Sequence, residues 1–192
     1  VVTEYLAYAG YDEFEQRTLQ RFGNGVQTRL QYDPARRWLQ SVATDPARGP
    51  ALQRLAFQYD AAGNVLALDN TRPVASGNQL GGPVRQSFAY DGLDQLVHAE
   101  GSFQQGSKKQ ESYALTLSYD AIGNIARWQQ TNRSVQGNRT RETVRDDSYA
   151  YAGLGPHAVS AIGRRSFQYD ANGNQLGWSD SANAQQRTVE WD

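Results

Sequence analysis

The chain contains no cysteine and only two histidines, at positions 98 and 157, among its 192 residues. Without cysteine a disulfide scaffold, a thiol nucleophile and a thiolate zinc site are all excluded. No apolar run reaches the ~18 residues that a membrane-spanning helix requires. A net charge of −1 provides no general attraction for nucleic acid or for an anionic membrane. The composition therefore points away from several enzyme classes and leaves binding and structural roles open.

What the chain has in quantity is neutral polar and aromatic residues. It contains 20 glutamines, 18 glycines and 11 tyrosines but only two lysines. This composition suits β-sheets with one solvated face better than charged helices. The length fits one domain, assigned here to residues 1–192. The start, Val-Val-Thr-Glu-Tyr, has neither an initiator methionine nor a signal pattern, so the sequence is expected to be a segment of a longer chain.

A Tyr-Asp dipeptide recurs along the chain at intervals of 21, 27, 31, 29 and 50 residues. Recurrence of a motif at intervals of 20–50 residues is typical of a repeat protein. The last interval is wide enough to contain a degenerate copy, and Tyr151 lies inside it. Three copies extend to Tyr-Asp-x-x-Gly-Asn. The predicted structural repeat residues are Tyr11, Asp12, Tyr32, Asp33, Tyr59, Asp60, Gly63, Asn64, Tyr90, Asp91, Tyr119, Asp120, Gly123, Asn124, Tyr169, Asp170, Gly173 and Asn174.

Each repeat predicts a strand, a tight turn and a second strand. Before the tyrosine, apolar residues alternate with polar ones, as in Tyr113, Leu115, Leu117 and Tyr119, which is the period of a half-buried strand. Aspartate at the first turn position can accept backbone hydrogen bonds, and a glycine later in the turn adopts positive φ without strain. The prediction is therefore hairpins at 60–64, 120–124 and 170–174. The tyrosines before them are expected to be buried.

Further turns and loops follow the same plan. Gly23-Asn24-Gly25 predicts a short hairpin between two strands. The aspartates at 33 and 91 are not followed by Gly-Asn, so their turns are expected to differ in geometry. About fifteen short strands and no helix are predicted. Polar stretches are expected to be loops at 45–50, 70–83, 101–111, 131–141 and 179–185.

These residues resemble the rearrangement-hot-spot (RHS) family, also called YD-repeat proteins. The resemblance covers the whole chain. It is most specific at Gly155-Pro156-His157-Ala158-Val159 followed by Tyr169-Asp170-Ala171-Asn172-Gly173-Asn174, which is similar to the stretch upstream of the family's conserved core. Gly23-Asn24-Gly25-Val26 with Tyr32-Asp33-Pro34 is similar to the B and C components of insecticidal toxin complexes. Val189-Glu190-Trp191-Asp192 resembles the opening of a further repeat.

The resemblance implies an all-β fold in which YD-repeat hairpins form a curved or spiralling antiparallel sheet, as a segment of a hollow shell. It implies a structural wall role in a secreted or cell-surface bacterial toxin-type protein, around a C-terminal toxin cargo. The expected partners are the remaining repeats, that cargo and other toxin-complex subunits. The family's self-cleaving core and toxic domain are expected beyond position 192. The alternative is a module that binds carbohydrate or protein at a cell surface, as in the related teneurins.

The groups in the sequence that could carry chemistry are better explained as structural. Six Tyr-Asp pairs at equal distance from a turn indicate a role in folding and no catalytic residue. Asp170-Ala-Asn172-Gly-Asn174 begins like a calcium loop but has Gln175 and Ser181 where that loop needs glycine and glutamate. Asp146-Asp147 is expected to be a solvated pair at a strand entrance, and the two histidines, at 98 and 157, lack the spacing of metal ligands. Neither a cofactor nor a metal is therefore expected. The arginines at 133, 139, 141 and 145 are diluted by acidic neighbours, which favours a loop face over contact with nucleic acid.

The ends of such a sheet raise a separate expectation. An open sheet exposes unpaired backbone groups on its first and last strands, and natural sheets usually guard those strands with lysine, proline or charge. The segment near Val1–Tyr8 carries one charge and is poorly guarded. Self-association through this edge is therefore predicted.

Overall fold

The computed structural model describes residues 4–73, 82–106, 108–153 and 155–191. Fifteen strands form one antiparallel sheet whose spatial order follows the chain. Among the described residues there is no helix. The strands are β1 (Leu6–Tyr11), β2 (Arg17–Phe22), β3 (Gln27–Tyr32), β4 (Leu39–Asp45), β5 (Gln53–Tyr59), β6 (Val65–Asn70), β7 (Val84–Tyr90), β8 (Leu96–Gln105), β9 (Lys109–Tyr119), β10 (Ile125–Gln136), β11 (Arg139–Ala150), β12 (Ala161–Ile162), β13 (Arg165–Tyr169), β14 (Gln175–Asp180) and β15 (Gln185–Thr188).

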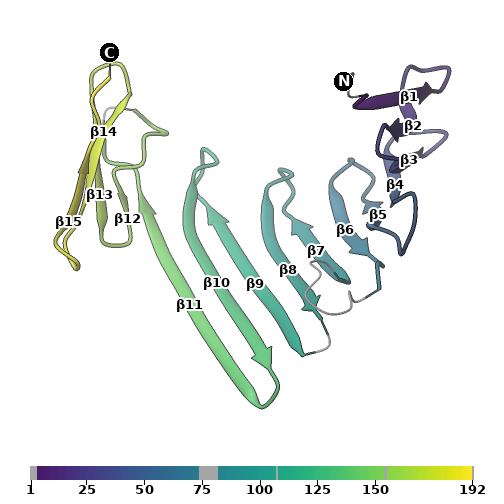
Figure 1. The fold of residues 1–192 in the computed structure, drawn as a ribbon. Coiled ribbons are helices and arrows are strands. Elements are labelled where there is room, and N and C mark those ends of the chain that lie inside the picture. Colours follow the sequence, from purple (N-terminus) through teal and green to yellow (C-terminus); the bar gives the residue numbers. More distant parts are fainter. Residues whose placement is uncertain (1–3, 74–81, 107, 154, 192) are drawn as a thin grey trace.

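The sheet is curved and does not close. Each strand pairs with its neighbours in the chain, and β1 and β15 lie at the two far ends of the sheet (Figure 1). This confirms the predicted all-β sheet of antiparallel hairpins. Because the strands follow one another as a meander, the turns after the Tyr-Asp pairs lie along one edge, called here the YD edge. The connection from β11 to β12 lies along the same edge, and the remaining turns lie along the opposite edge.

Two of the predicted loops are wrong. Residues 101–111 and 131–141 were expected to be loops, but β8 to β11 extend through most of both ranges and are the longest strands in the sheet. The ranges are rich in Ser, Thr, Gln and Arg, and these side chains tolerate an extended backbone whose hydrogen bonds are satisfied by a neighbouring strand. Among the described residues of these two ranges, the turns are confined to the tips at Gly106 and Gly137, which have φ of 61° and 56°.

The two faces of the sheet differ. Ala99, Leu115 and Leu117 are buried on one of them. Aromatic and aliphatic side chains pack around these three on the same face, called here the aromatic face: Phe88, Leu96, Tyr113, Tyr119, Ile125 and Trp128. The opposite, polar face carries the exposed residues that alternation predicted there, Gln58, Ala89, Ser118 and Gln168.

The core is thin because a single sheet has no second layer to cover its apolar side. Tyr59, Tyr90, Tyr119 and Tyr169 are half-buried, so the expectation that they would be fully buried was too strong. Burial of apolar area is the main favourable term in folding, and here it is limited to one partly covered face. Hydrogen bonds along the edges therefore carry more of the stability than in a two-layer domain.

Each turn that follows a Tyr-Asp pair is followed by a β-bulge at the start of its second strand. In the third repeat Tyr59 pairs with Val65 and Gln58 pairs with Ala67, which leaves Leu66 as the extra residue. The same shift occurs at the five other Tyr-Asp repeats. A bulge bends its strand and increases the right-handed twist. A bulge repeated at one edge gives each hairpin the same local bend and is consistent with the curvature in Figure 1.

Gly63 provides a test of the turn. Its φ is 102°, and an added Cβ would lie 3.0 Å from the Trp38 ring. The Gly63→Val variant should lower the free energy of unfolding by about 2 kcal/mol, because a β-branched residue resists this backbone region. Ala62→Val, one residue earlier on an exposed position, is the matched control. Equal denaturation midpoints for the two variants in chemical unfolding would contradict the turn assignment.

Candidate functional site

The aspartate of each Tyr-Asp-x-x-Gly-Asn motif organises its own turn. The Asp60 Oδ1 atom accepts hydrogen bonds from the backbone N–H groups of Ala62, Gly63 and Asn64 at 2.8–2.9 Å. Its Oδ2 atom accepts one from the Asn64 side-chain amide at 3.0 Å. The Asp120–Asn124 and Asp170–Asn174 pairs repeat the side-chain bond at 2.9 Å. The carboxylate thus satisfies amide groups that would otherwise be unpaired within the turn.

The prediction of positive φ for the motif glycines is confirmed. Gly63, Gly123 and Gly173 have φ of 102°, 85° and 85°. The expectation that the turn after Asp91 would differ is wrong. Asp94 occupies the glycine position with φ of 59°, and Asp91 Oδ1 accepts the same backbone bonds from Leu93 and Gln95. Aspartate tolerates the left-handed region better than most residues, so the geometry survives without glycine.

The turn after Asp33 does differ, as expected. It is one residue longer: the Arg37 N–H donates to the Asp33 carbonyl, the Asp33 N–H donates to the Trp38 carbonyl, and Arg37 has φ of 63°. The earlier turn at Asp12 keeps the common geometry, with Glu15 at φ of 61°. Asp12 also forms an ion pair with Arg37, which joins these two neighbouring turns.

The tyrosines of the repeats form a ladder along the YD edge. Six of these hydroxyls donate a hydrogen bond to a backbone carbonyl that follows the preceding connection on this edge. In five cases the acceptor is the first residue of a strand, and in the sixth it is Val159, two residues before β12. The bonds are Tyr32 to Arg17 (3.0 Å), Tyr59 to Leu39 (2.7 Å), Tyr90 to Val65 (3.0 Å), Tyr119 to Leu96 (2.7 Å), Tyr151 to Ile125 (3.1 Å) and Tyr169 to Val159 (3.0 Å). No motif in the sequence indicated this regular pairing in advance.

The ladder lies where the backbone pairing between repeats stops. The pair β6 and β7 is joined by the chain at the opposite edge, and its last residue pair toward the YD edge is Ala67 with Ser87. Beyond this point β6 and β7 have no paired residues, and the Tyr90 hydroxyl bonds the Val65 carbonyl instead. We use the word seam for such a pair, in which the chain connects the two strands at the opposite edge and the backbone pairing ends before the YD edge. Each tyrosine therefore closes one seam with a side-chain bond where the main-chain ladder ends.

At two positions without the Tyr-Asp motif, an aromatic side chain still donates the hydrogen bond that closes the seam. Tyr151, in the predicted degenerate copy without aspartate, makes the same bond as the full repeats. At the last seam the indole Nε1 of Trp191 donates to the Gln175 carbonyl at 2.9 Å, in the place of a tyrosine. This agrees with the sequence resemblance of residues 189–192 to the opening of a further repeat.

His157 is tied to the turn at 120–124. Its Nδ1 atom lies 2.7 Å from the Asn124 Oδ1 atom, and the Asn124 amide donates to Asp120 and to the Pro156 carbonyl at 2.9 Å and 2.8 Å. Because the amide nitrogen has two acceptors, its oxygen faces the ring and His157 Nδ1 is the donor. The histidine therefore fastens the loop before β12 onto this turn.

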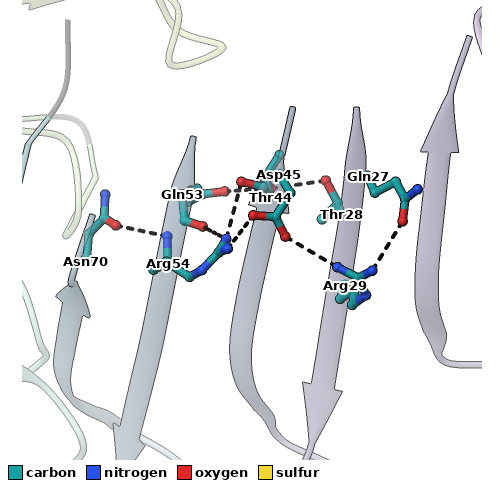
Figure 2. A network of polar contacts seen from close by, with 8 residues as sticks. All are labelled: Gln27, Thr28, Arg29, Thr44, Asp45, Gln53, Arg54 and Asn70. Atoms are coloured by element: carbon teal, nitrogen blue, oxygen red, sulfur yellow. Dashed lines mark hydrogen bonds and ion pairs between the residues drawn. The ribbon is translucent and has the colours of Figure 1, made fainter. Parts of the chain in front are cut away.

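The opposite edge is held by polar side chains instead of tyrosines. Figure 2 shows a network from β3 to β6 in which Asp45 forms ion pairs with Arg29, at 3.3 Å, and with Arg54. On the aromatic face, the Thr28 and Thr44 hydroxyls are 3.0 Å apart. The contacts Thr28–Thr44 and Arg29–Asp45 join β3 to β4, which are connected by the chain only at the YD edge. Exposed ion pairs of this kind contribute about 0–1 kcal/mol each.

In the part of the chain that the structure describes, no group of three His, Asp or Glu side chains converges as a metal site would require. Asp146 and Asp147, expected to be a solvated pair, are bonded to Arg127 at 2.7 Å and Arg145 at 2.5 Å. An open groove of about 440 Å³ lies on the aromatic face, with Val84, Phe103 and Tyr113 in its wall. No helix in the described residues is long and apolar enough to cross a membrane.

Comparison with known proteins gives two toxin subunits of Yersinia entomophaga. YenC2 is 29% identical over 155 residues and YenC1 is 28% identical over 152 residues. Each match covers 68% of this chain, which spans 16% of the length of the toxin subunit. No protein-family model matches the chain.

Solved structures of Tc toxin components share this fold. The crystal structure of TcdB2–TccC3 superposes with a TM-score of 0.65 at 20% identity over 91% of this chain and 10% of that one. A Photorhabdus luminescens Tc holotoxin pore gives 0.60 at 21% identity, over 97% and 10%. The chain is an RHS-like segment similar to those of Tc toxin components. The repeats of this RHS-like segment are thus the hairpins described above, which the YD turns close and the tyrosines join across the seams.

Removing one ladder hydroxyl tests its role in the RHS-like segment. Tyr119→Phe leaves the Leu96 carbonyl without its donor, so the free energy of unfolding should fall by about 1–2 kcal/mol. Tyr5→Phe is the control, because Tyr5 is 81% exposed. Thermal or chemical unfolding measures both variants. A Tyr119→Phe protein as stable as the Tyr5→Phe control would refute a stabilising role for the bond.

The turn carboxylates predict a loss of stability in acid. The hydrogen bond from the Asn64 side chain, together with backbone donors, lowers the pKa of Asp60 below 3.8. A group with a lowered folded-state pKa stabilises fully above its unfolded pKa, and this contribution is lost as pH falls through the folded value. Asp60→Asn should therefore be less stable than wild type at pH 6, with the difference shrinking below about pH 4. Unfolding curves across this range measure it, with exposed Glu13→Gln as control. A difference independent of pH would contradict the assignment.

Proposed function

We propose that this RHS-like segment is part of the wall of a hollow shell in a secreted bacterial toxin-complex protein, and that the shell encloses a toxin cargo. The segment itself performs no catalysis in this proposal. The observation that carries it is the tyrosine ladder, which lets hairpins add side by side without limit while the sheet stays one layer thick. A one-layer curved sheet is suited to surround a volume, whereas a compact domain fills its own interior.

The free edges support partners at both ends of the segment. β1 and β15 each pair on one side only. Tyr11, at a repeat position and 56% exposed, has no carbonyl acceptor among the described residues, although six later tyrosines have one. The proposal assigns to β1 a further repeat of the same shell as its neighbour. The predicted self-association through this edge remains a prediction, and Val1 to Thr3 lie outside the described residues.

Protection of the cargo is the test. In the full chain that contains this segment, the part that follows the repeats should resist protease in wild type. Replacing Tyr59, Tyr90 and Tyr119 together by phenylalanine opens three adjacent seams and should make that part sensitive. The Tyr5→Phe variant is expected to behave as wild type. If the following part were cleaved at the same rate in all three proteins, enclosure by this wall would be rejected.

One observation favours a second function, adhesion through a cell-surface ligand. The third residue of the turn, two positions after the aspartate, is a large exposed apolar side chain in three repeats: Phe14, Leu93 and Ile122, exposed by 61%, 78% and 56%. Exposed apolar residues that recur at one position of an edge are typical of a contact surface.

The two functions differ in what these tips do. If the segment is an adhesion module, Leu93→Ser with Ile122→Ser should reduce its binding to cultured cells at least about tenfold, as loss of buried anchor residues does. Ala62→Ser, at the same turn position, is the control. Cell binding that is unchanged by the double substitution would remove the support for adhesion.

A further inference from the structure

A charged pocket lies on the aromatic face between β11 and β14, near the edge opposite the YD turns. Its volume is about 360 Å³. Three arginines and two aspartates line it together with two apolar side chains: Arg145, Asp147, Ile162, Arg164, Arg165, Phe167 and Asp180. The tyrosine ladder and the YD turns make no use of these residues.

Two of the arginines are held in place by an aromatic ring and a carboxylate each. The Arg145 guanidinium lies 5.1 Å from the Trp128 ring centre, and its Nε is 2.5 Å from the Asp147 Oδ2 atom. The Arg165 guanidinium lies 4.8 Å from the Trp178 ring centre. Stacking on an indole face orients a guanidinium without using its hydrogen-bond donors.

The positive charge in this pocket is only partly neutralised. Arg165 Nε is 3.6 Å from Asp180 Oδ2, which is too long for a hydrogen bond. The Asp180 oxygens already accept bonds from the Ala182 N–H and the Asn183 amide, at 2.9 Å and 3.1 Å. Arg164 forms no ion pair or hydrogen bond with any residue that the structure describes. The Asp180 side chain is 8% exposed and that of Arg165 is 53% exposed, so the carboxylate lies below and the guanidinium faces solvent.

We propose that this pocket binds one carboxylate side chain of a polypeptide, with Arg164 and Arg165 as its ligands. Three guanidinium groups and two carboxylates leave a single net positive charge, which matches a monoanion better than a phosphate dianion. A guanidinium presents parallel N–H donors that fit the two oxygens of a carboxylate. Ile162 and Phe167 give the pocket an apolar wall, which suits a glutamate or aspartate with apolar neighbours. The inference does not depend on the wall function.

The experiment uses the full chain and two short peptides, acetyl-Phe-Glu-Phe-amide and its Gln analogue. Binding is followed by the protein's tryptophan fluorescence, because Trp178 stacks on Arg165. The Glu peptide should bind at least about tenfold more tightly than the Gln peptide, a ratio typical of a charge-assisted pair, and added salt should weaken it. Arg164→Gln with Arg165→Gln should remove this preference. Arg139→Gln, an exposed position on the same strand β11 outside the pocket, should retain it.

Three results would overturn the proposal. Equal affinity for the two peptides would show that the pocket does not recognise the charge. Loss of preference in Arg139→Gln would show a general electrostatic effect. Tighter competition by inorganic phosphate than by acetate would assign the site to phosphate. Circular dichroism confirms that each variant is folded, and Arg164→Gln alone, in the turn before β13, serves if the double variant is not.

Discussion

A hydrogen bond from an aromatic side chain, a tyrosine hydroxyl in six seams and the Trp191 indole in the last, to a backbone carbonyl is the interaction on which the rest of this structure depends. The sheet has one layer, so its apolar side chains are only partly buried and cannot hold the strands together alone. Consecutive strands are tied by a turn at one edge only, and at the other edge they are free to separate. The tyrosine binds at that free end, where the main-chain pairing has already stopped.

The turn and the bulge of each repeat position the atoms that form this hydrogen bond. The aspartate and the left-handed residue fix the turn, and the turn with its bulge positions the first carbonyl of the second strand. That carbonyl then accepts the hydrogen bond from the tyrosine of the next repeat. Each repeat therefore supplies the acceptor for the repeat that follows it. Trp191, which donates to the same kind of carbonyl, shows that the requirement is for a donor on an aromatic ring of sufficient reach.

Much of the fold could be predicted from the sequence, because the repeated turn motif and the period-two alternation are local signals. The strands at Tyr113 to Tyr119 and the positive φ of Gly63 follow directly from them. The length of β8 to β11 could not be predicted from the sequence. Polar residues such as those at 131–136 form a strand only when neighbouring strands satisfy their backbone hydrogen bonds. The turn after Asp91 was misjudged because aspartate can take the place of glycine. The ladder was missed because its partners are 10 to 26 residues apart and one of them is a backbone atom.

Hydrogen exchange on the full chain tests the central claim most directly. With Tyr59, Tyr90 and Tyr119 all replaced by phenylalanine, the account predicts faster exchange of amides in the three affected seams near the YD edge. Amides within the hairpins that the YD turns close, such as those of β5 and β6 near Asp60, should keep their wild-type protection. Exchange that is unchanged in the seams, or that rises equally across all strands, would contradict the claim that these hydroxyls hold the repeats together.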